Sequence, residues 1–152
     1  MSKYTAKQLK EMNDLLLSTY ERALEDLKAI EVPVSEDIKE IKINSVATTR
    51  WGVCKRRNGQ YIIEISDTLC LGYTNQGLYE TICHELMHTC KGAMNHGPNW
   101  LQHVDKCNSI YGTKIKATND RYEKGFTEET YAACNRYKYE VWCEDCDRML
   151  AG

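Results

Sequence analysis

The chain has 152 residues, of which 42% are hydrophobic and 28% charged, which is typical of one soluble globular domain with its own core. Its net charge is −2 and both signs are balanced along the chain, so composition does not favour a dedicated duplex-binding protein, which usually has a basic face. No apolar run approaches the roughly 18 residues of a membrane span, and the N-terminal segment has no signal-peptide core. We therefore expect an intracellular protein that is not secreted and has no membrane partner.

The first predicted element is a long helix. Thr5 and Gln8 have the spacing of a capping box, in which each side chain bonds the other residue's backbone N–H. Apolar residues then recur at helical spacing, which predicts a helix over residues 6–30 that ends before Pro33. We expect this helix to act as a scaffold.

A small sheet is expected next. Residues 41–45 have the pattern of a short strand. Residues 50–56 and 61–66 flank Asn58 and Gly59, a pair that strongly favours a tight hairpin. The three segments together predict a small antiparallel sheet.

Two helices are predicted after the sheet. Residues 78–90 carry apolar side chains on or near one helical face. Pro98 has the character of a first helical position, and Gly112 that of a C-terminal stop, so a second helix is expected between them.

The remaining segments give weaker signals. Residues 114–118 are compatible with a short strand, and residues 119–133 show no clear period. Residues 137–143 alternate like a strand that leads into Cys143 and Cys146. Most of the eight cysteines stand singly in apolar stretches, as free thiols do in a reducing compartment.

Residues 84–88 carry the most informative motif, HExxH. Because residues i and i+4 share one face of an α-helix, His84 and His88 can both bind a single Zn²⁺. Glu85 follows His84 directly and is placed to take a proton from a water on the metal, whose pKa zinc lowers towards about 7. The chain has only four histidines, and one site would use three of them.

A catalytic zinc also needs a third protein ligand and an open position for water. The metzincin spacing is excluded, because Lys91 and Met94 occupy the positions of its glycine and third histidine. The thermolysin-like choice would be a later glutamate, but no glutamate lies between His88 and Tyr122.

Two histidines remain as candidates for this third ligand. His96 precedes the helix that Pro98 opens, where a loop can turn the imidazole back to the metal. His103 lies within that helix, where a partly exposed histidine is the ordinary interpretation. We favour His96 and keep His103 as the alternative.

Three segments of the chain resemble the SprT-like metallopeptidase family, whose eukaryotic relatives are the Spartan DNA–protein crosslink proteases. They are residues 83–89 (CHELMHT), residues 96–112, which begin HGPNW, and residues 137–146. The resemblance spans about residues 5–146. It implies that His96 is the third zinc ligand.

The fold class that we expect is α+β. The resemblance implies a zincin-like, minigluzincin-type metalloprotease domain with a long N-terminal helix, a small antiparallel sheet, the HExxH helix and a following helix. We assign residues 1–133 to this SprT-like domain and residues 134–152 to a partial zinc-ribbon-like segment. The family's ribbon uses two cysteine pairs, whereas this segment has one. Cys134 would add a third ligand, but no fourth follows, so we expect two free thiols at Cys143 and Cys146 and a single catalytic Zn²⁺.

The function that we predict is peptide-bond hydrolysis by a zinc metalloprotease, with Glu85 as general base and then proton donor. A protein or peptide is the expected substrate. The resemblance adds single-stranded DNA or DNA–protein complexes as partners, a role in DNA repair, and a cytoplasmic or nucleoid-associated location, nuclear in a eukaryote. Oxyanion stabilisation would need a second electrophile besides zinc; a tyrosine or arginine among residues 119–139 could serve, but nothing in the sequence singles one out.

Two alternatives remain open. One is a DNA- or chromatin-associated binding module with a mainly structural zinc, although a structural site has no need of the Glu85 carboxylate. The other is a zinc hydrolase that acts on a bond other than a peptide, since HExxH fixes the nucleophile and leaves the substrate open.

Overall fold

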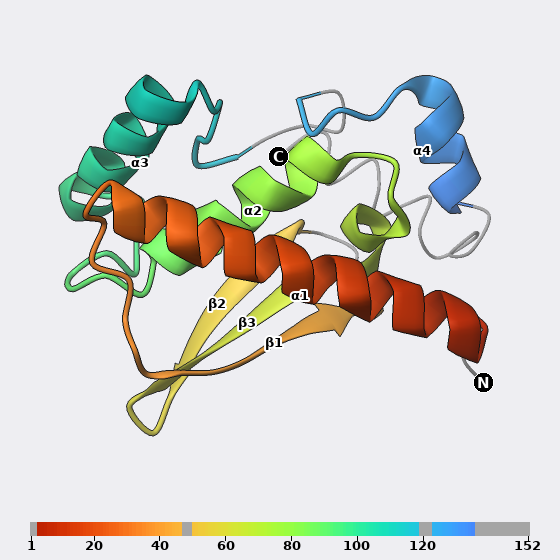
Figure 1. Ribbon diagram of the computed structural model, residues 1–152, viewed down its shortest axis with the longest axis horizontal. Helices are drawn as coiled ribbons and strands as arrows, with labels where there is room; N and C mark the ends of the chain where they lie inside the picture. The colour runs from red at the N-terminus through yellow and green to blue at the C-terminus, as the bar shows by residue number, and fades with distance from the viewer. Residues whose placement is uncertain (1–2, 47–49, 119–122, 136–152) are drawn as a thin grey trace.

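The computed structural model describes residues 3–46, 50–118 and 123–135. They form a mixed α+β arrangement with one three-stranded sheet (Figure 1). The elements in chain order are α1 (Ala6–Ala29), β1 (Ile38–Asn44), β2 (Gly52–Arg57), β3 (Gln60–Ser66), a 3-10 helix η1 (Asp67–Leu71), α2 (Asn75–Met87), α3 (Pro98–Tyr111) and α4 (Glu128–Asn135).

Helix α1 confirms the expected long N-terminal helix. Thr5 Oγ1 accepts a hydrogen bond from the Gln8 N–H at 3.1 Å, and Gln8 Oε1 accepts one from the Thr5 N–H at 2.8 Å, so the capping box is present. One face of the helix is buried; it consists of Met12, Leu16, Thr19, Ala23 and Leu27. Burial of this stripe, more than helix propensity, stabilises α1 in the folded chain.

The hairpin between β2 and β3 is also confirmed. Asn58 and Gly59 have φ values of 54° and 78°, as a two-residue type I′ turn requires at both central positions. Glycine adopts positive φ without strain, and asparagine tolerates it better than most residues.

The prediction of an antiparallel sheet is wrong for one of its two strand pairs. The strand order is β1-β3-β2, and β1 pairs with β3 in parallel, with Ile43 opposite Ile65. After β1 the chain passes the end of β3 to begin β2, and the hairpin then returns β3 between the two earlier strands. The consecutive strands β1 and β2 are therefore not neighbours, and local patterns carry no information on the insertion of β3 between them.

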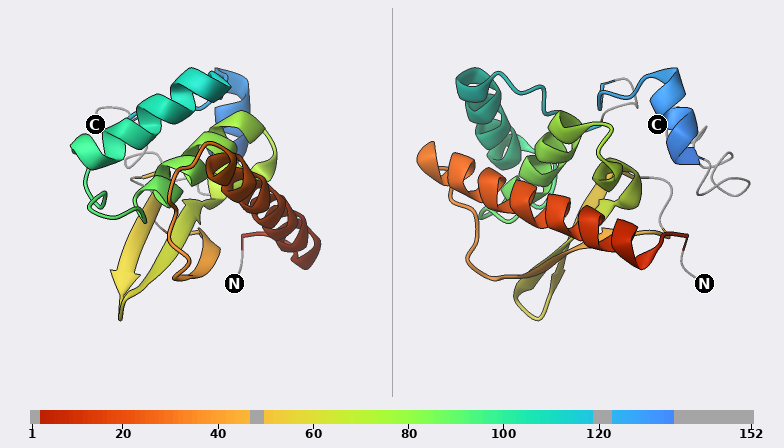
Figure 2. Two further views of the ribbon diagram at one scale, coloured as in Figure 1. Left: turned by 60° about the vertical axis from the view of Figure 1, so that its left-hand side comes forward. Right: turned by 45° about the vertical axis from the view of Figure 1, so that its right-hand side comes forward.

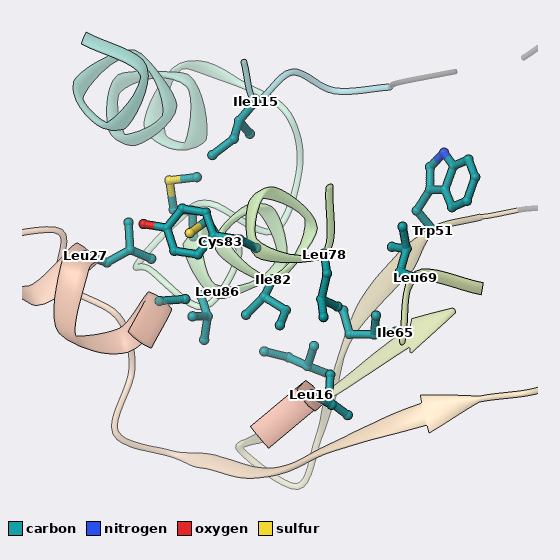
Figure 3. Packing of buried hydrophobic residues seen from close by; sticks show 14 of the residues in the cluster. Leu16, Leu27, Trp51, Ile65, Leu69, Leu78, Ile82, Cys83, Leu86 and Ile115 are labelled. Atoms are coloured by element: carbon teal, nitrogen blue, oxygen red, sulfur yellow. The ribbon is translucent and has the colours of Figure 1, made fainter. Parts of the chain in front are cut away.

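Helices α1 and α2 lie on the same side of the sheet, and α3 lies on the side of α2 away from it (Figures 1 and 2). Leu16 and Leu27 of α1 meet Ile82 and Leu86 of α2, while Ile65 contributes from the sheet (Figure 3). All five side chains are 1% exposed or less. The five cysteines whose side chains are described are free thiols, and four are buried, as their apolar settings predict; they are Cys54, Cys70, Cys83, Cys90 and Cys107.

Helix α2 begins and ends about three residues earlier than expected. Thr74 is the N-cap, and its side chain accepts a hydrogen bond from the Gly77 N–H at 3.3 Å. The helix ends at Met87, with His88 as its C-cap. Helix α3 has the predicted ends, with Pro98 in its first turn and Gly112 at φ 69° as the C-cap.

Residues 114–118 are not a strand, contrary to the prediction. Side chains of the two neighbouring helices satisfy the backbone instead: Glu80 accepts from the Lys114 N–H at 3.1 Å, and Asn108 accepts from the Ile115 N–H at 3.0 Å. Helix α4 begins within residues 119–133, the segment without a clear period, and ends at Asn135. Residues 137–143, Cys143 and Cys146 lie outside the described residues. Among the described helices, none is both long and apolar enough to cross a bilayer.

Candidate metal centre and active site

Three imidazoles converge at the C-terminal end of α2. His84 lies in the last turn of α2, His88 is its C-cap, and His96 comes from the loop before α3. The Nε2 atom of His96 is 3.1 Å from that of His84 and 3.2 Å from that of His88. Tetrahedral zinc with Zn–N bonds of about 2.0–2.1 Å places its ligand nitrogens about 3.3 Å apart, so the three rings fit one metal ion.

The structure brings His96 to the HExxH pair and leaves His103 elsewhere on α3. Within the three described ranges, His84, His88 and His96 are the one group of three or more histidine, cysteine or acidic residues with ligand atoms close enough for a metal, all within 4.8 Å. His103 is partly exposed and outside this group.

Hydrogen bonds within the loop 88–98 hold His96 in place. Asn95 Oδ1 accepts from the Gly97 N–H at 2.9 Å, and Asn99 Nδ2 donates to the Gly92 carbonyl at 3.2 Å. Gly92 has a φ of 70°, and a Cβ there would lie 2.6 Å from Asn99 Nδ2. The short loop therefore folds back on the start of α3 and presents the imidazole to α2.

The histidines are in the state that binds metal. His88 Nδ1 donates to the Ala93 carbonyl at 2.7 Å, which leaves the Nε2 lone pair free for a ligand bond. Burial, and then the positive charge of His88 and Lys124, lowers the pKa of His84 to about 2. Burial also lowers the pKa of His88 and of His96. Neutral imidazoles at physiological pH need lose no proton to bind a cation.

Glu85 is buried beside this cluster and is not part of it. Its Oε2 lies 3.9 Å from His84 Nε2, and its residue is 5% exposed. A Cβ at Gly52 on β2 would lie 3.2 Å from the same oxygen. Burial raises the pKa of Glu85 to about 8, against the positive charges of Lys124 and Arg50. A carboxyl group in this position can exchange a proton with a water bound at the cluster.

Lys124 is a residue of this region that the sequence did not single out. It is 5% exposed, and the Thr74 hydroxyl donates to its carbonyl. A Cβ at Gly77 would collide with that carbonyl oxygen, so the turn at 123–125 packs directly on the start of α2. Burial lowers the pKa of Lys124 to about 8, against the charges of Glu80 and Glu85. No motif or period marks this part of the sequence.

The structure describes only part of residues 119–139, the stretch that could supply an oxyanion-stabilising tyrosine or arginine. Tyr131 of α4 is 1% exposed and packs edge-on against Phe126, with ring centroids 5.5 Å apart, so it belongs to the core. In the described part of that range, the buried cation is Lys124.

This mixed α+β domain brings three neutral imidazoles together beside a buried carboxyl group. Proteins with such a site can hold a metal ion such as zinc. The family model of the SprT-like family matches residues 15–123, most of the chain. The protein belongs to the SprT-like family, which is in general of the zinc metalloprotease type. No curated protein matches the chain.

Proposed function

We propose that the protein is a zincin-like, minigluzincin-type zinc metallopeptidase that hydrolyses peptide bonds. The observation that carries the proposal is the burial of the Glu85 carboxylate 3.9 Å from His84, next to three imidazoles that converge on one point. A purely structural zinc site has no need of such a carboxylate. Membership of the SprT-like family supports the same activity.

The residues of the site have separate roles in the proposed reaction. His84, His88 and His96 would hold the ion through their Nε2 atoms. A bound zinc ion would lower the pKa of a coordinated water to about 7 and polarise the substrate carbonyl. Glu85 takes the proton of the attacking water and returns it to the leaving amine, since its side chain is buried beside the imidazole cluster, 3.9 Å from His84 Nε2.

The test is the hydrolysis of an unfolded protein such as casein by the zinc-loaded protein and its Glu85→Gln variant. The variant keeps all three histidines, so we expect full zinc content and an activity at least about 10²-fold lower. Glu64→Gln is the matched control, because it removes a buried carboxylate from the sheet, away from the histidines. Near-normal hydrolysis by Glu85→Gln would refute the proposed mechanism.

The runner-up is a DNA- or chromatin-associated binding module in which the zinc is mainly structural. It predicts that zinc-loaded wild type hydrolyses no peptide bond and that Glu85→Gln leaves every measured property unchanged. A zinc hydrolase with another substrate predicts inactivity on proteins together with a Glu85-dependent activity on esters.

A further inference from the structure

One indole contacts all three members of the histidine cluster. Trp100 lies in the first turn of α3 and is 0% exposed. Its ring centroid is 4.7 Å from that of His84, 5.3 Å from that of His88 and 4.6 Å from that of His96. The His88 ring is stacked on the indole at 16°, whereas the other two rings meet it at 61° and 62°.

The same indole completes the end of α2. Trp100 Nε1 donates a hydrogen bond to the backbone carbonyl of His84 at 3.3 Å. The last four carbonyls of a helix lack partners within it. Here the next three, those of Glu85, Leu86 and Met87, accept from the N–H groups of residues three positions later, and the His84 carbonyl accepts from the indole. Trp100 is therefore a side-chain cap for the turn that carries both HExxH histidines.

Trp100 also contacts the third predicted ligand, His96, through its ring. His96 precedes Trp100 by four residues and lies just outside the N-terminus of α3, where a side chain can fold onto the first helical turn. His96 is exposed, so on its solvent side nothing comparable restrains its ring. The indole is the surface on which this imidazole rests.

We propose that Trp100 is the positioning residue of the metal centre: its indole holds the three imidazoles in metal-binding geometry before the metal arrives. A ring that is already oriented loses little conformational freedom on binding, so the affinity for metal rises. A core tryptophan without this role would change the stability of the fold and leave the affinity of the folded protein for metal unaltered. The inference rests only on the metal-binding part of the proposed function.

The experiment measures zinc affinity by competition with a chromophoric chelator, in parallel with thermal unfolding of the metal-free protein. Trp100→Leu removes the hydrogen bond and the ring contacts, and we expect affinity to fall about 10- to 100-fold, as for other groups that orient metal ligands. Trp100→Phe keeps an aromatic ring and loses the N–H, so we expect a smaller loss. Trp51→Phe is the control, since Trp51 stacks on Phe126 at 5.7 Å.

Cobalt replaces zinc in a second measurement, because its visible spectrum reports coordination geometry. We expect an altered spectrum for Trp100→Phe and the wild-type spectrum for Trp51→Phe, even where both variants lose similar stability. If Trp100→Leu does not fold, Trp100→Phe decides alone. Wild-type affinity and spectrum in the folded Trp100 variants would overturn the inference, whereas a wild type that binds no zinc would overturn the metal site itself.

Discussion

Gly52 of β2 lies against Glu85 of α2. Any residue with a Cβ at position 52 would force a neighbouring side chain to move. A Cβ at residue 52 would lie 3.2 Å from Glu85 Oε2, 3.1 Å from Thr81 Cγ2 and 3.2 Å from Ile65 Cδ1. All three distances are shorter than ordinary van der Waals contact, so at least one neighbour has to shift.

We predict that Gly52→Ala displaces the Glu85 carboxylate and lowers kcat for peptide hydrolysis by about 10-fold or more, because catalysis is sensitive to sub-ångström misplacement. Zinc content should stay at the wild-type level, since the histidines are not touched. The measurement is steady-state hydrolysis with metal analysis on the same samples. Val53→Ala, on the opposite face of β2, is the control; an equal loss in that variant would attribute the effect to a weakened strand.

At the scale of single residues, the spacing of His84 and His88 was sufficient to predict their convergence, because helix geometry alone dictates it. The nearness of Gly52 to Glu85 could not be predicted, because it joins residues 33 positions apart. The contacts of Trp100 with three imidazoles could not be predicted either, because they depend on how α3 crosses α2.

Among the elements, those defined by local chemistry were predicted well. The capping box, the Asn58–Gly59 turn and the two ends of α3 each depend on a few adjacent residues. The parallel pairing of β1 with β3 and the side-chain bonds to residues 114–115 depend on distant partners and leave no pattern in the sequence. The early start of α2 follows from Thr74, a cap that the apolar period does not reveal.

The loop 88–98 gives a direct test of the third ligand. His96→Ala should lower zinc content or affinity, because one of three ligand atoms is lost. His103→Ala should leave zinc content intact, because this residue lies outside the cluster. Metal analysis after dialysis distinguishes them. A metal-free His103→Ala protein beside a metal-replete His96→Ala protein would reverse the assignment.

The contribution of Glu64 on β3 to the stability of the fold depends on pH. Burial alone would raise the pKa of this carboxyl, but hydrogen bonds from Lys55 at 3.0 Å and Asn44 at 2.7 Å, with the charge of Lys55, bring it below its ordinary value. A carboxyl with a lowered folded-state pKa stabilises the fold above its unfolded-state pKa, about 4.3, and this contribution is lost as pH falls through the folded-state pKa.

We therefore predict that Glu64→Gln lowers the free energy of unfolding at pH 7 and that the difference from wild type shrinks below about pH 4. Its size should be below about 1 kcal/mol, because the Lys55 side chain is 46% exposed and water screens the pair. Urea unfolding at pH 7 and pH 3 measures it. Glu40→Gln, an exposed position on β1, is the control; an equal effect there would contradict the assignment.

Over the whole molecule the positive and negative charges are nearly balanced. A hollow beside the metal centre, in contrast, is lined by positive side chains without negative ones. This hollow of about 660 Å³ is bordered by Arg56, Tyr61, Lys91 and Asn95 among others, and none of its lining residues is acidic. We propose that it supplies the contact with single-stranded DNA that the family resemblance implies. With two cations, binding should be weak and should fall steeply with salt.

The corresponding prediction is that single-stranded DNA stimulates cleavage of a DNA-bound protein at low salt and has much less effect at physiological salt. Changing both Arg56 and Lys91 to glutamine should remove the stimulation, whereas changing Lys7 and Lys28 of α1 should preserve it. The readout is cleavage with and without DNA, and Glu85→Gln is the blank. Equal cleavage under all conditions would leave a peptidase without DNA dependence.

The order of elements along the chain also has a consequence during synthesis on the ribosome. The apolar stripe of α1 emerges first, but its partners in β3 and α2 come much later in the chain, and the indole that caps α2 comes later still. Because domains generally fold as units, we expect the stripe to stay uncovered at least until α2 has left the exit tunnel. We expect the uncovered stripe to be a binding site for chaperones at that stage, before His96 has joined His84 and His88 at the metal centre.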